Sequence, residues 1–185
     1  EMQKRIDDYP NILRPANYPG SCPGNGYVIF NAGNIKVLVI SLLGNVYMDA
    51  FDSPFETAKR ILEREYGKYD VSVIDFHAEA TSEKAALARY LAGTVTAVVG
   101  THTHVQTSDA RIFAKGTAFI TDLGMTGPYD SILGVKEECI LYKFTTKMPV
   151  RFEQADGAVQ FNAAITDIDE STFKAKSITA INLIK

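Results

Sequence analysis

Short apolar segments that end in histidine-containing loops constrain the fold of this chain more than any other feature. VSVIDFHAEATSEK (residues 71–84) and VTAVVGTHTHVQT (residues 95–107) each contain a near-continuous apolar run, typical of a strand buried on both faces. All three histidines of the chain, His77, His102 and His104, follow these runs. Because open α/β sheets bind ligands at the carboxyl ends of their strands, the sequence predicts a site where these strands end.

The segments around these two strands alternate between strand and helix patterns, which favours a layered α/β fold. A capping box predicts a helix from Ser53 to about Tyr66, and a second helix is expected from Thr81 or Ser82 to Gly93. The strands expected in this half are 26–30, 36–43, 71–76, 94–99, 110–115 and 117–121. From residue 135 onward the pattern predicts strands alone, 139–145, 150–154, 159–168 and 174–183, with an Asp-Gly turn among them. A single domain over residues 1–185 is the simplest interpretation.

The composition is that of a globular protein with a sizeable core, since 46% of the residues are hydrophobic. A net charge of −3 argues against a duplex nucleic-acid partner but allows a small nucleotide or phosphodiester substrate. No apolar run approaches the ~20 residues of a membrane span. Cys22 and Cys139 form no metal-binding pair, which predicts reduced cysteines in a cytoplasmic protein. The sequence is compatible with a homo-oligomer and carries no signal that fixes the stoichiometry.

The histidine loops have the residue types of a metal site. Imidazole binds borderline divalent cations near neutral pH, and an extended His-x-His segment directs both rings to the same side. We therefore expect His102 and His104 to be metal ligands, with His77 as a further one; the alternative is that they only form hydrogen bonds in polar loops. Asp75 either orients a neighbouring ligand or forms a second metal-binding fragment with His77. Glu83 is expected to interact only with the dipole of a helix that begins near it.

Ligand counting leaves this site short of donors. Three imidazoles cannot hold two ions, and none of the nearby carboxylates clearly bridges a pair of metals. The site is therefore either mononuclear or completed by donors outside this chain.

Two further segments have features of an anion site. The glycine-rich loop after residue 121 is flexible enough for its backbone N–H groups to approach a phosphate, which makes Gly124, Met125, Thr126 and Gly127 candidate substrate contacts. The alternative is a turn-rich connection without a ligand. Arg14 and Asn17, in the segment LRPANY, are further candidate substrate contacts. No G-x-S-x-G elbow and no P-loop occurs in the sequence.

Four strings together resemble one family. LRPANYPG, DFHAEATSEK, VVGTHTHVQTSDARI and TAFITDLGMTGPYDSILG, in this order, are similar to the YmdB family of bacterial calcineurin-like metallophosphoesterases. The resemblance implies a four-layer αββα sandwich with two divalent metal ions (Fe, Mn, Zn or Mg) and hydrolysis of phosphodiesters, with 2′,3′- and 3′,5′-cyclic nucleotides as candidate substrates. It also implies that His77 and His102 bind one ion and that His104 binds the other.

The metal-binding motifs of the family's N-terminal portion have no counterpart in these residues. That portion carries a bridging Glu and the histidine that acts near the leaving group. Residues 1–11 also have the pattern of a helix without a start signal. We therefore expect a partial domain, assign no catalytic side chain within it, and expect this chain alone to be inactive. The alternatives are a metal- or nucleotide-binding regulatory module without turnover, and a mononuclear hydrolase that uses Asp75 and His77.

Overall fold

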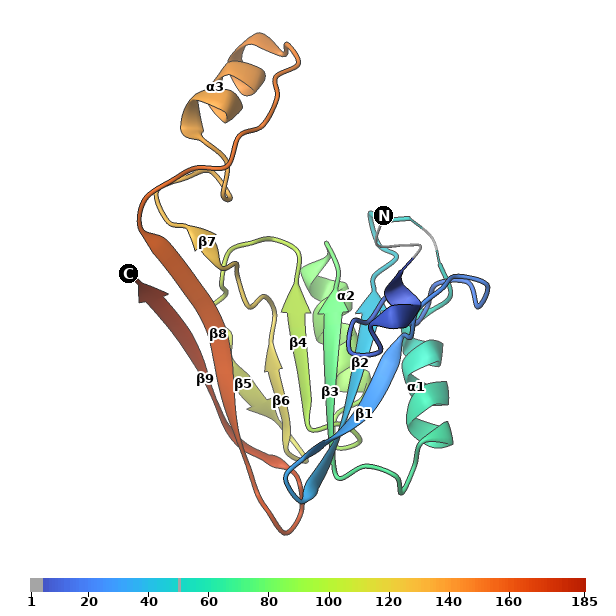
Figure 1. The fold of residues 1–185 in the computed structure, drawn as a ribbon. Helices are drawn as coiled ribbons and strands as arrows, with labels where there is room; N and C mark the ends of the chain where they lie inside the picture. Colours follow the sequence, from blue (N-terminus) through green and yellow to red (C-terminus); the bar gives the residue numbers. More distant parts are fainter. Residues whose placement is uncertain (1–4, 50) are drawn as a thin grey trace.

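A computed structural model describes residues 5–49 and 51–185 and has a six-stranded mixed sheet at its centre (Figure 1). The strand order is β1-β2-β3-β4-β6-β5, in which neighbours from β2 to β6 are parallel and the edge strands β1 and β5 are antiparallel. The bounds are β1 Tyr27–Ala32, β2 Ile35–Leu43, β3 Val71–His77, β4 Ala97–Thr101, β5 Arg111–Phe113 and β6 Thr117–Ile120. The carboxyl ends of the four parallel strands therefore lie at one edge of the sheet, the upper edge in Figure 1.

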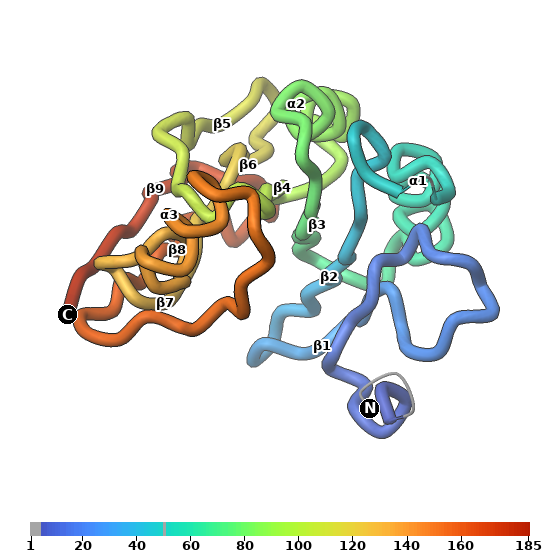
Figure 2. The backbone as a smooth tube through the Cα atoms, turned by 90° about the horizontal axis from the view of Figure 1, so that it is seen from above, coloured from blue at the N-terminus to red at the C-terminus, as the bar shows by residue number. Residues whose placement is uncertain are grey.

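Helices α1 (Pro54–Arg64) and α2 (Thr81–Tyr90) cover one face of this sheet, as the view from above in Figure 2 shows. Alternate residues of β2, which are Leu38, Ile40 and Leu42, are fully buried in the core that forms there. The predicted start of α1 is confirmed, because the Ser53 hydroxyl accepts a hydrogen bond from the backbone N–H of Glu56. The predicted cap of α2 is wrong: Thr81 and Ser82 lie inside the helix, which begins after Ala80 with no side-chain cap.

A second, antiparallel sheet packs on the other side. It consists of β7 (Gly127–Pro128), β8 (Val159–Ile168) and β9 (Ala175–Ile184). Strand β9 contacts β5 and β6, and the small side chains of Ala97, Ala118 and Ala175 let the two sheets approach closely. The predicted α/β class with two sheets is confirmed, and the described residues form three of the four layers. The side of β8 and β9 that carries Phe161, Ile165 and Leu183 stays exposed.

The segment between β7 and β8 differs from the prediction of strands alone. Residues 139–145 belong to helix α3 (Glu137–Thr146), which projects from the body of the molecule in Figure 1. The first turn of α3 carries Glu137 and Glu138 and its last turn carries Lys143, charges that stabilise a helix at these ends. Residues 150–154 form no strand, only an isolated bridge from Gln154 to Val135.

The remaining expectations have mixed outcomes. The strands predicted over 159–168 and 174–183 are β8 and β9. At the N-terminus, Ile6–Asp8 form a short 3-10 helix, and residues 1–4 of the expected helix lie outside the described residues. Both cysteines are free. In the part of the chain that the structure covers, no helix has the length and apolar character needed to cross a bilayer.

Candidate metal centre

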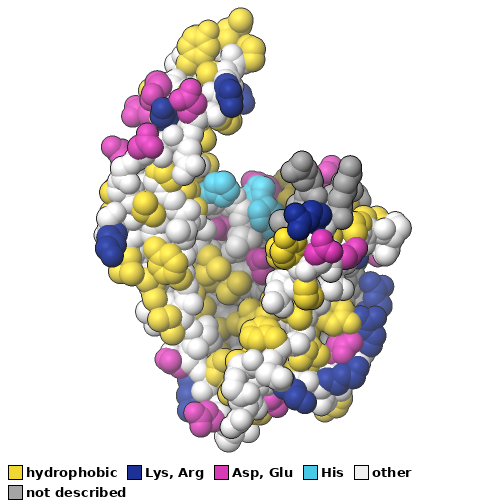
Figure 3. All heavy atoms as spheres, viewed as in Figure 1, with side chains coloured by type: hydrophobic (Ala, Val, Ile, Leu, Met, Phe, Trp, Pro, Cys, Tyr) yellow, Lys and Arg dark blue, Asp and Glu magenta, His cyan; other side chains and the backbone are white. Residues whose placement is uncertain are grey.

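The candidate centre lies at the carboxyl edge of the six-stranded sheet, where β3 and β4 end. His77 is the last residue of β3 and is paired in parallel register with Thr101, the last residue of β4. His102 follows directly, so that His77 Nε2 and His102 Nδ1 are 3.0 Å apart. Figure 3 shows the histidine side chains close together at the upper edge of the body, below the projecting arm.

Polar neighbours behind each ring favour hydrogen on its outer nitrogen. The Thr101 hydroxyl donates to Asp75 Oδ1 over 3.2 Å and therefore accepts from His77 Nδ1 over 3.1 Å. His102 Nε2 lies 2.5 Å from Glu79 Oε2, a carboxylate oxygen that only accepts. The two facing nitrogens lie at hydrogen-bond distance, with donor and acceptor set by the tautomers. With hydrogen on both outer nitrogens, as a cation bound between the rings would require, each facing nitrogen presents a lone pair.

Two facing lone pairs at this separation suit a shared cation. Imidazole nitrogens bind zinc at about 2.1 Å, so two ligands at a coordination angle of about 90° to 109° are about 3.0 to 3.4 Å apart. The 3.0 Å between the two rings lies in this range. Hydrogen bonds from the outer nitrogens to oxygen atoms are the usual way in which proteins orient imidazole ligands. His77 and His102 therefore fit two adjacent positions around one divalent ion.

His104 lies outside this pair. It is exposed and lines a separate cavity of about 300 Å³, together with Met125, Asn162 and Asn182. Over residues 5–49 and 51–185, no group of three or more His, Cys, Asp or Glu side chains is arranged to hold a metal ion. The described residues thus supply two donors for one ion and do not complete a dinuclear centre.

The His-x-His backbone is not extended, contrary to the prediction. His102 has a φ of 136° and His104 a φ of 65°, in a region that residues with a Cβ rarely adopt. Such strain persists only where the surrounding structure imposes it, and it is common at functional sites. Thr103, between the two histidines, donates its backbone N–H to Asp122 Oδ2 over 2.9 Å. The contacts of this loop, and not the period of a strand, set the directions of the two rings.

Burial shifts the pKa values of two side chains in the centre. Burial and the neighbouring His102 lower the pKa of His77, which favours the neutral imidazole that binds metals. Burial raises the pKa of Asp75, and the Thr101 hydroxyl and His77 oppose this only in part. Asp75 reaches His77 through Thr101, which is the geometry of a residue that orients a ligand.

Asn17 and Arg14 have structural partners instead of open surfaces. The fully buried Asn17 donates from Nδ2 to the carbonyls of Leu43 and Asp52 and accepts from the N–H of Leu43 through Oδ1. It therefore fastens the loop to the end of β2, and its prediction as a substrate contact is not supported. The Arg14 guanidinium donates to three carbonyls, those of Pro15, Cys22 and Pro23. It lines a groove with Arg60 and Arg64, next to α1.

The glycine-rich loop reaches the cavity beside His104. Met125 lines this cavity, and Thr126 is exposed. The N–H of Gly124, however, donates to Asp122 Oδ1 over 2.9 Å, so it is not free to bind an anion. Met125, Thr126 and Gly127 stay predicted substrate contacts. The prediction for Gly124 is weaker, because its N–H already has a partner.

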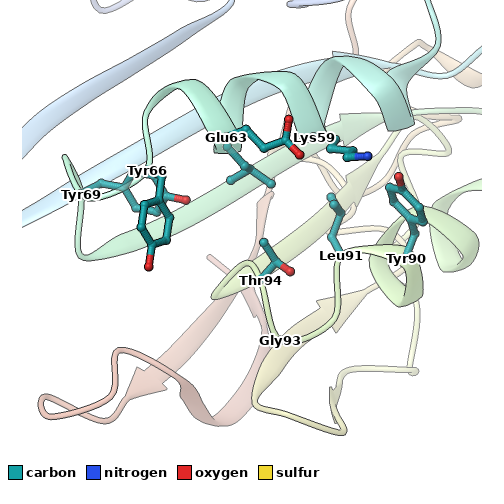
Figure 4. Close-up of a pocket in the computed structure, with 9 residues that line it drawn as sticks. Lys59, Glu63, Tyr66, Tyr69, Tyr90, Leu91, Gly93 and Thr94 are labelled. Atoms are coloured by element: carbon teal, nitrogen blue, oxygen red, sulfur yellow. The ribbon is translucent and has the colours of Figure 1, made fainter.

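A further groove is far from the histidines in the fold. It holds about 740 Å³ between the carboxyl-terminal ends of α1 and α2, where Tyr66, Tyr69 and Tyr90 line it (Figure 4). Both helices begin at the carboxyl edge of the sheet and run away from it, so this groove belongs to the opposite edge (Figure 1).

Similar proteins point to one family. The model of the YmdB-like protein family matches residues 1–181. The 2′,3′-cyclic-nucleotide 2′-phosphodiesterase of Bacillus subtilis (strain 168) is 49% identical over 176 residues, 95% of this chain and 67% of that protein. A crystal structure of a hypothetical protein from Thermus thermophilus has a TM-score of 0.92 and 38% identity, covering 100% of this chain and 71% of that one. A novel phosphatase from Mycoplasma pneumoniae has a TM-score of 0.87 and 32% identity, covering 98% and 68%. The chain spans about two thirds of the length of the curated relatives it matches.

Proposed function

The chain belongs to the YmdB-like protein family, and on this premise we propose that it forms part of the active site of a metal-dependent phosphodiesterase. The observation that carries the proposal is the His77–His102 pair, whose facing nitrogens lie 3.0 Å apart while oxygen atoms hold the outer nitrogens. This arrangement suits a divalent cation held between two oriented imidazole rings.

The proposed substrates are small cyclic phosphodiesters, with 2′,3′-cyclic nucleotides first and 3′,5′-cyclic nucleotides second. The Bacillus subtilis relative acts on the first class by its name. In this reaction a water oxygen bonds to phosphorus, the bond from phosphorus to the 2′ oxygen breaks, and that oxygen takes up a proton. The product is a nucleoside 3′-monophosphate.

The residues of this chain have distinct proposed roles. His77 and His102 hold one ion, and His104, which lines the cavity with Met125 and Asn162, contributes to a second ion whose other donors lie outside the described residues. Bound at such a centre, a divalent cation supplies Lewis acidity to a phosphate oxygen and lowers the pKa of a water molecule. Thr101 and Glu79 fix the two rings in the tautomers that leave the inner nitrogens free, and Asp75 acts through Thr101.

The test is hydrolysis of 2′,3′-cyclic AMP by the protein expressed from the full reading frame that encodes this chain, with the 185-residue chain, expected to be inactive alone, as the comparison. The Bacillus subtilis relative serves as the positive control. We expect turnover to 3′-AMP that needs Mn²⁺ or Zn²⁺, stops with a chelator and falls in His102→Ala. Tyr66→Phe, in the exposed turn after α1 and far from the histidines, is the matched control and should stay active. Absence of turnover of any cyclic nucleotide by the protein from the full reading frame, with metal bound, would refute the proposal.

A binding module without turnover is the second candidate, because the described residues contain no group of three metal donors. Such a module would bind a metal or a nucleotide and release it unchanged. Equilibrium dialysis with 2′,3′-cyclic AMP separates the two candidates: His102→Ala abolishes turnover in an enzyme, whereas it only weakens binding in a module.

A further inference from the structure

A buried ion pair lies directly behind the histidine loop. Lys84 Nζ and Asp122 Oδ2 are 3.0 Å apart, and both side chains are at most 1% exposed. Lys84 stands in the first turn of α2, and Asp122 follows β6. Lysine and aspartate are almost never fully buried unless they are paired, so this pair needs a physical reason.

The contacts of Asp122 supply that reason. Its Oδ2 accepts from the backbone N–H of Thr103 as well as from Lys84, and its Oδ1 accepts from the N–H of Gly124. One carboxylate thus joins the residue between His102 and His104, the glycine-rich loop and helix α2. An apolar side chain of the same size would pack as well but could not hold two backbone N–H groups and an ammonium at once. Replacing a buried ion pair by apolar residues is often neutral for stability, so stability alone does not account for it.

The backbone around Lys84 leaves room for this pair. A Cβ added at Gly100 would lie 2.9 Å from Lys84 Cδ and 1.8 Å from the carbonyl oxygen of Thr121. Only glycine at this position of β4 leaves space for both the aliphatic part of the Lys84 side chain and the backbone that follows β6. Glu83, next to Lys84, repeats the arrangement on the other side: its carboxylate accepts from the N–H groups of Asn45 and Val46, after β2. The expectation that Glu83 interacts only with the helix dipole is therefore incomplete.

We infer that Lys84 and Asp122 are positioning residues of the candidate metal centre, which hold Thr103 and thereby fix the strained backbone of His102 and His104. The expected effect on metal binding rests on the proposed function, whereas the positioning of the histidine loop does not depend on it. Neither residue touches the substrate or the ion in this role.

The unmodified protein gives the first test, by amide hydrogen exchange. Thr103 is exposed, but its N–H is bonded to a buried carboxylate. We expect this amide to be protected, together with that of Gly124. Exchange of the Thr103 amide at the rate of an unstructured loop would overturn the inference.

The variant test removes both charges together, as Lys84→Met with Asp122→Asn, so that no buried charge is left unpaired. Because the chain has only three histidines, a long-range ¹H–¹⁵N spectrum resolves every ring. We expect shifted ring signals for His102 and His104 and a zinc affinity lowered by about 10- to 100-fold, as for other residues that orient metal ligands.

Leu91→Ala is the matched control for lost stability. Leu91 is 3% exposed and ends the same helix, beside the groove of Figure 4 at the other edge of the sheet. We expect a lower free energy of unfolding with unchanged ring signals and zinc affinity. Equal changes in both variants, or ring signals and zinc affinity in the double variant that match the unmodified protein, would overturn the inference.

The two proposals fail in different ways. A protein that binds zinc and shows the expected ring shifts but hydrolyses no cyclic nucleotide refutes the phosphodiesterase and leaves the positioning role. An active enzyme whose double variant binds zinc normally refutes the positioning role and leaves the enzyme.

Discussion

A methyl group added at Gly100 is expected to destabilise the protein more than one added at a glycine with free space around it. In Gly100→Ala the new carbon would lie 1.8 Å from the carbonyl oxygen of Thr121, where about 3.3 Å is the closest favourable separation. The missing distance of about 1.5 Å cannot come from a side-chain rotation, because the obstacle is backbone. Strand β4 would have to move from β6, and the Lys84 stem would have to move as well.

The magnitude follows from these contacts. Overpacking a core costs about 1 to 3 kcal/mol, and a backbone obstacle places this variant at the upper end, about 3 kcal/mol. The lower conformational entropy of the unfolded chain with alanine offsets only about 0.4 to 1 kcal/mol of this loss. With a urea m-value of about 2 kcal/mol/M, a net loss of about 2 kcal/mol lowers the unfolding midpoint by about 1 M.

Two further glycines calibrate the assay. Gly20 has nothing within 4 Å of an added Cβ and needs no left-handed backbone, so Gly20→Ala should unfold at the same or a slightly higher urea concentration. Gly44→Ala should fall between the two, since its Cβ would meet the movable Glu83 carboxylate and Ala78 Cβ, each at 2.5 Å. Gly100→Ala with the midpoint of the unmodified protein would refute the close packing of β4, β6 and Lys84.

Five further substitutions test other parts of the structure. Asn17→Ala removes three hydrogen bonds to the backbone of Leu43 and Asp52 and should lower the free energy of unfolding by about 2 to 4 kcal/mol in a urea titration; a loss below about 0.5 kcal/mol would contradict the buried network. Thr101→Val removes the acceptor of His77 Nδ1 and should lower zinc affinity by about 10- to 100-fold in a competition assay, with an altered His77 tautomer; an unchanged ring spectrum would contradict this. His102→Ala should weaken the first zinc equivalent by more than about 100-fold, beyond the effect of Thr101→Val, and His104→Ala should weaken it less. Hydrogen bonds from threonine hydroxyls and from the backbone outweigh the effect of burial and lower the pKa of Asp109. Its contribution to stability is therefore present above the unfolded-state pKa of about 3.9 and is lost as pH falls through the lower folded-state pKa. Asp109→Asn should accordingly flatten the dependence of the urea unfolding midpoint on acid pH.

The central sheet could be predicted because its strands are buried on both faces. The apolar runs that become β3 and β4 must be covered on both sides, which places these strands inside a sheet. Their carboxyl ends lie side by side in parallel register and bring His77 and His102 together. Helix α3 could not be predicted in the same way. It is packed through little more than Cys139 and Ile140, so the hydrophobic pattern of this segment carries no clear period.

The directions of the site residues depend on contacts that the sequence does not reveal. Asn17 has the residue type of a substrate contact but is bound on three sides by backbone groups. His104 follows His102 by two residues, yet a positive φ at both positions turns the loop, and His104 lines another cavity. Periodicity assumes regular backbone, and strained loops are where that assumption fails.

The first turn of α2 accounts for how three loops meet at one centre. Glu83 binds the loop after β2, and Lys84 holds Asp122, which binds the loops after β4 and β6. A charged pair at the start of a helix ordinarily indicates a solvated turn, and here Gly44, after β2, and Gly100, in β4, leave room for the two side chains. The geometry of the histidines therefore depends on a helix that contributes no ligand, because its two charged side chains hold the loops that follow the strands.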